Sequence, residues 1–253
     1  MTQQRRQDLI MEMIKDQGFV SIDALVDHFK VTPQTIRRDL NFLAQEKLIR
    51  RHHGGAGLES STVTNTAYQD RKILNLSEKE RIASALVKEI PDGSSLFINI
   101  GTTTETIAKA LLNHKNLTVV TNNIHVATLL YAKEDFTVIL AGGEIRHRDG
   151  GVVGEATRDF INQFQMDFGI IGISAIHPDG SLLDYDFREV KVAQSIIANS
   201  HQVMLAADHS KFGRSATVRL GNISQADHFF TDEQPPTGIK TCLDEHQVNL
   251  HIV

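Results

Sequence analysis

The chain has 253 residues, of which 41% are hydrophobic and 23% are charged, a composition that excludes a disordered protein. At roughly 150 residues per domain, this length predicts about one and a half to two domains. The single cysteine, Cys242, excludes an intrachain disulfide and fits a reducing compartment. The N-terminus lacks a signal-peptide pattern and no apolar run has the length of a membrane span, so we expect a soluble, cytoplasmic protein.

Charge is distributed unevenly along the chain. Residues 1–58 contain nine Lys or Arg and seven Asp or Glu, whereas the remainder contains 17 and 24. Residues 30–53 alone contain six Lys or Arg against two Asp or Glu. A basic N-terminal segment on an acidic body is the pattern that contact with a phosphate backbone requires.

Three short helices are predicted in the N-terminal segment. Apolar side chains at helical spacing fill the first helix up to Gly18, and Ser21 is a suitable cap for the second. Thr32 is a suitable N-cap for the third helix, with Pro33 at its first position, where the missing N–H costs nothing. One stripe of this third helix is expected to face the core: Ile36, Leu40, Leu43 and Ala44.

The start of the third helix and its outward face carry polar side chains that suit DNA. Asn and Gln can pair with adenine and Arg with guanine, while Thr and further Arg side chains hold phosphates. Two short helices, a tight turn and a polar third helix are typical of a helix-turn-helix, whose second element enters the major groove. The candidate DNA-binding residues here are Thr32, Gln34, Thr35, Arg37, Arg38 and Asn41.

A short basic strand is predicted from residue 48, running into a glycine turn at residues 54–55. As part of a β-hairpin, its cations would reach flanking phosphates or the minor groove. The alternative is a three-helix interaction module with a solvated hairpin. A metal site at the adjacent histidines is not expected, because neighbouring strand residues diverge and no further Cys or His completes a ligand set. The candidate residues of this hairpin are Arg50, Arg51, His52 and His53.

Residues 31–40 (VTPQTIRRDL) and 48–56 (LIRRHHGGA) resemble the winged helix-turn-helix signature of the DeoR family of bacterial sugar-metabolism repressors. The resemblance continues past this unit and covers the whole chain. It implies an N-terminal winged helix-turn-helix of the α+β class that binds double-stranded operator DNA.

Beyond a polar linker at residues 58–74, short β-branched runs alternate with helical stretches. Ser77 and Glu80 predict a capping box that opens a helix ending near Ile90. Helical stretches are also expected near 103–112, 123–132, 155–164 and 187–199. This alternation predicts an α/β domain with a mostly parallel sheet covered on both faces. Strands are expected at 96–99, 117–121, 137–140, 168–173, 203–207 and 229–231.

Small or polar residues follow most of these strands at their carboxyl ends. Ligands of parallel sheets bind outside this edge, so the loops are expected to form one pocket. Arg146 and Lys211 would neutralise a phosphate at a helix N-terminus, and Asn122 and Asp208 would hold hydroxyls. The candidate effector-binding residues are Asn99, Gly101, Thr102, Thr103, Thr104, Asn122, Gly142, Gly143, Arg146, Ser174, Asp208 and Lys211.

The motifs at 101–103, 120–123, 140–144 and 208–213 are similar to those of the DeoR-family effector domain, which is itself similar in fold to ribose-5-phosphate isomerase. The resemblance implies a small phosphorylated effector. Glycerol-3-phosphate is the expected effector, and another sugar phosphate is the alternative. Many members have Asp at the position of Asn99, a departure that bears on any Asp-specific contact with a hydroxyl.

A sugar-phosphate isomerase is the competing hypothesis. Glu189 and Lys211 match the isomerase's general base and phosphate-side lysine, but residues 172–176 lack its strand-end carboxylate. Residues 184–187 also replace its glycine-rich approach to the base. Neither a nucleophile elbow, a P-loop nor a dinucleotide fingerprint occurs. We therefore expect no catalysis, no metal and no cofactor.

Together with these patterns, the resemblance implies a repressor of genes for glycerol or glycerol-3-phosphate metabolism. Residues 1–57 are expected to bind operator DNA, residues 58–74 to link, and residues 75–253 to bind an effector that weakens operator binding. A single winged unit covers too little DNA for high specificity, so we expect a homodimer or homotetramer.

Overall fold

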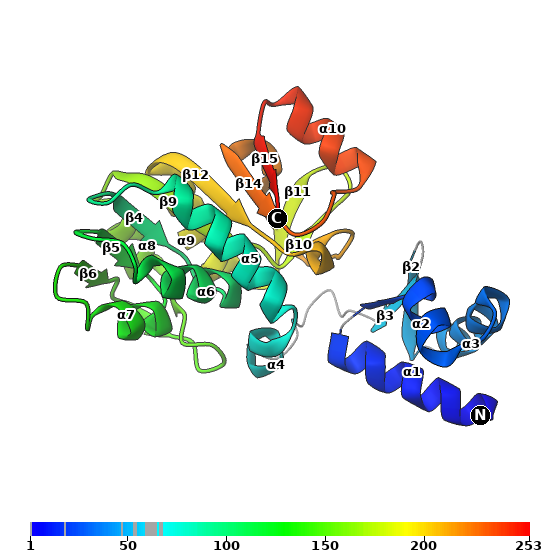
Figure 1. The fold of residues 1–253 in the computed structure, drawn as a ribbon. Coiled ribbons are helices and arrows are strands. Elements are labelled where there is room, and N and C mark those ends of the chain that lie inside the picture. The colour runs from blue at the N-terminus through cyan, green and yellow to red at the C-terminus, as the bar shows by residue number, and fades with distance from the viewer. Residues whose placement is uncertain (1, 18, 47, 53–54, 59–64, 66–67) are drawn as a thin grey trace. The chain divides into compact units, whose positions relative to one another are not determined.

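The computed structural model describes residues 2–17, 19–46, 48–52, 55–58, 65 and 68–253 (Figure 1). The chain divides into two compact units, Met1–Asn65 and Thr66–Val253. Within the described residues, no helix has the combination of length and apolar character that crossing a bilayer takes.

The N-terminal unit is a helix-turn-helix with a small antiparallel sheet in the order β1-β3-β2. Ser21 caps the second helix by accepting a hydrogen bond from Ala24 N at 3.1 Å, and Thr32 caps the third, both as predicted. The elements are α1 (Gln3–Gln17), β1 (Phe19–Ser21), α2 (Ile22–Phe29), α3 (Pro33–Gln45), β2 (Ile49–His52) and β3 (Gly55–Leu58).

The core of this unit confirms the inward stripe of α3. Ile36, Leu40 and Leu43 are buried and Ala44 is half-buried. They pack with Ile10 and Ile14 of α1 in one apolar cluster. Strand β1 is not part of the sequence prediction, because a segment of three residues between two helices is too short to show the alternation of apolar and polar residues that indicates a strand. The hairpin of β2 and β3 is present, while Gly54 lies outside the described residues.

The C-terminal unit is built on a parallel sheet in the order β15-β14-β12-β9-β4-β5-β6. All the predicted strands occur in it, which confirms the α/β class, and β15 is an additional edge strand. The strands are β4 (Ser95–Ile98), β5 (Thr118–Thr121), β6 (Thr137–Leu140), β9 (Met166–Gly172), β12 (Ser200–Ala206), β14 (His228–Thr231) and β15 (Asn249–Ile252).

Helices cover both faces of this sheet (Figure 1). Strand side chains alternate, so Leu96 and Ile98 of β4 belong to one apolar cluster while Phe97 between them belongs to the other. One cluster is covered by α5 (Leu76–Leu86), α6 (Thr102–Leu111) and α7 (Ile124–Leu130). The other contains residues of α8 (Glu155–Ile161), α9 (Phe187–Ala198) and α10 (Thr237–Glu245).

Several features of this unit differ from the sequence prediction. The capping box at Ser77 is wrong: α5 begins at Leu76, and its N-cap Asn75 has a left-handed backbone without a side-chain cap bond. Part of the expected linker is helical, since α4 spans Tyr68–Ile73. Short antiparallel strands were also missed: β7 (Glu144–Ile145), β8 (Val152–Val153), β10 (Ala175–Ile176), β11 (Ser181–Asp184) and β13 (Val218–Asn222).

Candidate functional site

The outward face of α3 exposes most of the side chains predicted to contact DNA. The two threonines at its start stabilise the first turn instead. Thr32 Oγ1 accepts a hydrogen bond from Thr35 N at 3.3 Å, and the two hydroxyls lie 2.9 Å apart. This capping fixes the residue at which α3 begins, and with it the position of the exposed polar side chains along the helix. The exposed residues are Gln34, Arg37, Arg38 and Asn41.

The hairpin places Arg51 against α3. Its Nη1 atom donates to Asn41 Oδ1 at 2.5 Å and to the backbone oxygen of Arg37 at 3.3 Å. The role predicted for Arg51 is a phosphate contact, whereas the contacts of its Nη1 atom in the structure lie within the protein. Arg50 and His52 lie on the same strand, β2, and His53 lies outside the described residues.

A buried ion pair that the sequence analysis missed holds α3 on α1. Asp39 is 1% exposed, and its Oδ2 lies 2.5 Å from Nε of Arg6. Its other oxygen accepts a hydrogen bond from Gln7 Nε2 at 3.4 Å. Breaking a buried ion pair leaves an uncompensated charge, so this contact fixes where α3 lies on α1. The signal in the sequence was an acidic residue on the inward face of a basic helix.

In the C-terminal unit, two asparagines follow neighbouring strands at the carboxyl edge. Asn99 follows β4 and Asn122 follows β5, and the register pairs Ile98 with Thr121 just before them. Asn122 Nδ2 donates to Val152 O at 3.1 Å. The Oδ1 atoms of both asparagines are buried and have no hydrogen-bond partner among the described residues. Because such acceptors are costly to leave unpaired, they suit a ligand that brings hydroxyl donors.

The N-terminus of α6 opens beside these asparagines. Gly101 has a φ of +149°, a backbone conformation that side-chain-bearing residues rarely adopt. Thr102 and Thr103 in the first turn are buried, as is Thr104. The Thr104 hydroxyl bonds to the backbone oxygens of Asn99 and Gly101, at 2.7 Å each, so it shapes the loop. Gly101, Thr102 and Thr103 therefore present the helix terminus, where an anion is stabilised.

Lys211 and Asp208 lie together after β12. The Nζ atom of Lys211 is 4.0 Å from Asp208 Oδ2, and both residues are buried. Burial lowers the pKa of Lys211 to about 8, assisted by repulsion from Arg214, Lys79 and Arg71 and opposed by Asp208. A buried cation surrounded by other cations is stabilised by an arriving anion.

Asp208 is already occupied by partners of its own. Its Oδ1 accepts hydrogen bonds from Asn75 Nδ2 at 2.8 Å and Ser210 N at 3.0 Å. Burial opposes ionisation, but Lys211 and the hydrogen bonds from Ser210 and Asn75 lower the pKa of Asp208 to about 2. Asp208 is therefore an anion that balances Lys211, rather than the free hydroxyl acceptor that the sequence suggested.

Lys79 is a further cation that the sequence analysis missed. It is 2% exposed, although it lies on the amphipathic helix α5. Its Nζ donates to the backbone oxygens of Arg71 and Leu74, at the end of α4. Burial lowers the pKa of Lys79, and Asp208 opposes this effect. Lys79 is buried and interacts electrostatically with Asp208 and Lys211, so Lys79 and Lys211 form one group of buried cations.

Helix α4 is held against this edge by side chains of both its ends. The Tyr68 hydroxyl donates to Glu105 of α6 at 2.8 Å, and the Tyr68 ring stacks on His125. Arg71 Nη2 lies 3.4 Å from Asp149 Oδ2. Thus α4, which lies inside the predicted linker, contacts α6, α7 and the loop that follows Arg146.

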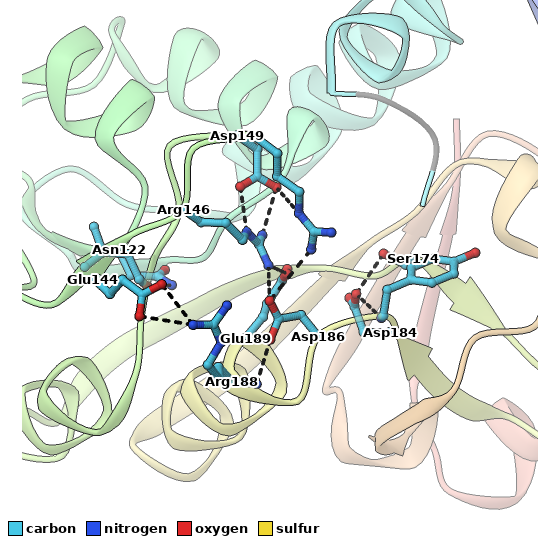
Figure 2. A network of polar contacts seen from close by, with 12 residues as sticks. Asn122, Glu144, Arg146, Asp149, Ser174, Asp184, Asp186, Arg188 and Glu189 are labelled. Atoms are coloured by element: carbon cyan, nitrogen blue, oxygen red, sulfur yellow. Dashed lines mark hydrogen bonds and ion pairs between the residues drawn. The ribbon is translucent and has the colours of Figure 1, made fainter. Parts of the chain in front are cut away.

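Arg146 is surrounded by carboxylates rather than left for a phosphate (Figure 2). It forms two hydrogen bonds of 2.8 Å with Asp149 and approaches Asp186 at 3.1 Å and Glu189 at 2.7 Å. Burial opposes its charge, but Glu189 and Asp149 raise the pKa of Arg146. The role predicted for Arg146, a phosphate-neutralising cation, therefore differs from the role its contacts give it in the structure.

Two carboxyls in this network have perturbed acidities. Burial and the nearby Asp184 raise the pKa of Glu189, and burial raises the pKa of Asp184. Asp184 accepts a hydrogen bond from the Ser174 hydroxyl at 3.1 Å. Glu189 thus acts as a partner of Arg146, and Ser174 as a partner of Asp184 (Figure 2).

The glycines Gly142 and Gly143 shape the turn after β6. The Thr157 hydroxyl donates to Gly142 O at 2.9 Å. At Gly143, which has a φ of +152°, a Cβ atom would lie 2.1 Å from Thr157 Oγ1. Both glycines are exposed and bring the chain close to α8. A separate groove of about 540 Å³ runs along α5 beside Val253 and contains none of the predicted effector residues.

One group of potential metal ligands occurs among the described residues: His209, Asp232 and Glu233. Asp232 accepts hydrogen bonds from His209 Nδ1 at 2.5 Å and from His209 N at 2.7 Å. The side-chain bond to Asp232 raises the pKa of His209, which burial opposes, and the two bonds together use both carboxylate oxygens. The geometry is that of a histidine–aspartate pair that orders the loop before Lys211.

A winged helix-turn-helix followed by an α/β unit with buried cations at its carboxyl edge defines a class: DNA-binding transcription regulators with a sensor domain. Residues 6–62 match the family described as "DeoR-like helix-turn-helix domain", and residues 74–233 match "DeoR C terminal sensor domain". The chain belongs to the DeoR family, and it is a transcription regulator rather than an enzyme.

Curated relatives cover the chain from end to end. It is 57% identical over 252 residues to the glycerol-3-phosphate regulon repressor of Escherichia coli, covering 100% of both chains. The repressor of that name from Haemophilus influenzae is 51% identical and is covered to 97%, with 99% of this chain. Among solved structures, ribose 5 phosphate isomerase A from Neisseria gonorrhoeae is 17% identical, with a TM-score of 0.40 over 57% of this chain and 55% of that one.

Proposed function

We propose that the protein represses genes of glycerol or glycerol-3-phosphate metabolism and leaves its operator when glycerol-3-phosphate binds the C-terminal unit. In this proposal residues 1–57 bind the operator and residues 75–253 bind the effector. The segment 58–74, which includes α4, links them. The regulator acts in the cytoplasm as a homodimer or homotetramer, since one winged unit contacts too few base pairs for high specificity.

The observation that carries the proposal is the group of buried cations at the carboxyl edge. Lys211 and Lys79 are both buried, and Asp208 interacts with both of them. A phosphate dianion at this place would be stabilised by both ammonium groups and by the N-terminus of α6. The relatives named as glycerol-3-phosphate regulon repressors support the choice of effector.

The remaining part of the effector would face the two unpartnered amide oxygens. Asn99 Oδ1 and Asn122 Oδ1 each require a donor, and the hydroxyl groups of a glycerol moiety supply donors. An inorganic phosphate lacks this moiety, and free glycerol lacks the anion. The effector is therefore expected to need both parts, and each part alone should bind weakly.

The test uses the full-length protein and a DNA duplex that it selects from a randomised library. Glycerol-3-phosphate should release the duplex. It should also raise the unfolding temperature, because a hundredfold excess over the dissociation constant adds about 2.7 kcal/mol to the free energy of unfolding. Glycerol and inorganic phosphate serve as controls and should not release it. Release by ribose-5-phosphate or another sugar phosphate, with none by glycerol-3-phosphate, would establish the alternative effector class instead.

A second measurement separates the two units. The fragment 75–253 should bind glycerol-3-phosphate by calorimetry yet fail to retain the selected duplex in a gel shift. Retention of DNA by this fragment at physiological salt would overturn the assignment of residues 1–57 to the operator.

A further inference from the structure

The contact between Arg51 and Asn41 joins the wing to the outward face of α3. Arg51 and Ile49 share one face of β2, because side chains alternate along a strand, and Ile49 is buried in the core of the unit. The Arg51 side chain therefore starts on the face that packs on α3. Its Nη1 atom donates to Asn41 Oδ1 and to the backbone oxygen of Arg37.

This contact fixes the orientation of the Asn41 side-chain amide. A guanidinium group has donors and no acceptor, so the amide atom facing it must be the oxygen. The Nδ2 group of Asn41 then points away from Arg51. Asn41 is exposed, and none of the hydrogen bonds in the described residues involves this NH2 group. The helix thus offers a donor at Asn41, while the acceptor is already in use.

We propose that Arg51 is a positioning residue for operator recognition, which makes Asn41 present a hydrogen-bond donor to a base acceptor in the major groove. The available acceptors are N7 and O6 of guanine, N7 of adenine and O4 of thymine. An unrestrained asparagine would instead use both its oxygen and its nitrogen on adenine. Arg51 therefore excludes cytosine, which presents only a donor in the major groove, and it also excludes the two-bond contact of Asn41 with adenine.

The partners of Arg51 argue against a phosphate contact as its main role. Both acceptors of its Nη1 atom belong to α3, and its Nε atom is buried without a hydrogen-bond partner in the described part of the chain. A guanidinium group that contacts the DNA backbone would expose its N–H donors to solvent in the free protein. The rest of the unit keeps α3 fixed for this purpose, since Asp39 binds Arg6 of α1 from the opposite, buried side.

The experiment is a double-mutant cycle on the full-length protein, with the duplex selected by the parent from a randomised library. Asn41→Ala should weaken binding roughly 5- to 150-fold, the effect of leaving a base acceptor unpaired. Arg51→Ala should cause a similar loss, and the double variant should be no more than about twofold weaker than Arg51→Ala. Losses that multiply in the double variant would overturn the proposal.

A charge-conserving variant separates positioning from electrostatics. Arg51→Lys keeps the cation but cannot hold both acceptors in the planar geometry of a guanidinium. We expect it to keep the salt dependence of the parent while it accepts a wider set of bases in a repeated selection. Parent-like affinity and base preference in Arg51→Lys would show that only the charge matters.

The neighbouring cation Arg50 gives the matched control. Arg50→Ala should weaken all sequences alike, and the slope of log affinity against log salt should become shallower by about 0.9, the value for one lost phosphate contact. Its loss should multiply with that of Asn41→Ala. If Arg51→Ala instead behaves like Arg50→Ala in both respects, Arg51 is a phosphate contact and the proposal is wrong. Thermal unfolding of each variant confirms that the unit remains folded.

Discussion

Two cations in loops of the C-terminal unit, Arg146 and Lys211, have the same appearance in the sequence and opposite surroundings in the structure. Arg146 contacts Asp149, Asp186 and Glu189, all within 3.1 Å (Figure 2). Lys211 has one carboxylate at 4.0 Å and is repelled by other cations nearby. The number of carboxylates around a buried cation, which the local sequence does not reveal, decides whether it is available to a ligand.

Removing Arg146 should have the largest effect, and it should act on stability. Arg146→Met removes the cation that contacts Glu189 and leaves Asp149 and Asp186 with only their longer contacts to other arginines. Breaking a buried pair costs about 3–5 kcal/mol. We expect a large fall in the urea midpoint of unfolding of the full chain. Normal stability together with a loss of effector binding would reverse the comparison, since Arg146 would then be the ligand cation.

Removing Lys211 should act on effector binding. Lys211→Ala removes a hydrogen bond to a charged group, so the affinity for glycerol-3-phosphate should fall roughly 10- to 150-fold in calorimetry. Affinity for the selected duplex without effector should stay near the parent value. Lys191→Ala, at an exposed lysine of α9, is the control and should change neither property. An unaltered effector affinity in Lys211→Ala would remove this residue from the site.

The pH dependence of effector binding should report the same lysine. With a pKa of about 8, Lys211 is mostly charged at pH 7 and loses its proton as the pH rises further. A bound phosphate raises this pKa, so binding takes up a growing fraction of a proton as the pH rises through about 8. Affinity should therefore fall by only about twofold between pH 7 and 8, where the phosphate is already a dianion, and then by up to about tenfold per pH unit. A fall of equal size in Lys211→Arg would assign it to another group.

The smallest effect is expected at the exposed rim of the Arg146 network. Arg188 contacts Glu144 at 2.9 Å, but both side chains are accessible to water. Exposed ion pairs contribute little because solvent screens them. Glu144→Gln should leave the unfolding temperature within error of the parent, and a shift comparable to that of Arg146→Met would contradict the distinction between buried and exposed pairs.

Local signals in the sequence were sufficient for much of the fold. The cap at Thr32, the proline after it and the inward stripe of α3 are all short-range features, and each is present as predicted. The apolar strands of the parallel sheet were equally readable, because strands buried on both faces are continuous hydrophobic runs. Strand β15 was not, since its residues Asn249–Ile252 form a half-exposed edge with polar positions.

The candidate site was harder to predict, because it depends on long-range contacts. Lys79 reads as a surface lysine of an amphipathic helix, yet it is buried by α4, a helix that lies inside the expected linker. Asn41 and Arg51 were both recognised as polar and outward, but only their contact shows that one amide oxygen is in use. Ion pairs with residues distant in the sequence likewise distinguish Arg146, which contacts Asp186 and Glu189, from Lys211, which does not.

The ammonium group of Lys79 connects the candidate effector site to the end of α4. An ammonium group carries three N–H bonds, and two of them already end on the carbonyls of Arg71 and Leu74, at the C-terminus of α4. Only one N–H remains for any other acceptor. An anion that draws this ammonium toward itself must share it with carbonyls that otherwise terminate a six-residue helix. Amide hydrogen exchange in α4 is therefore a direct readout of what Lys79 is bound to.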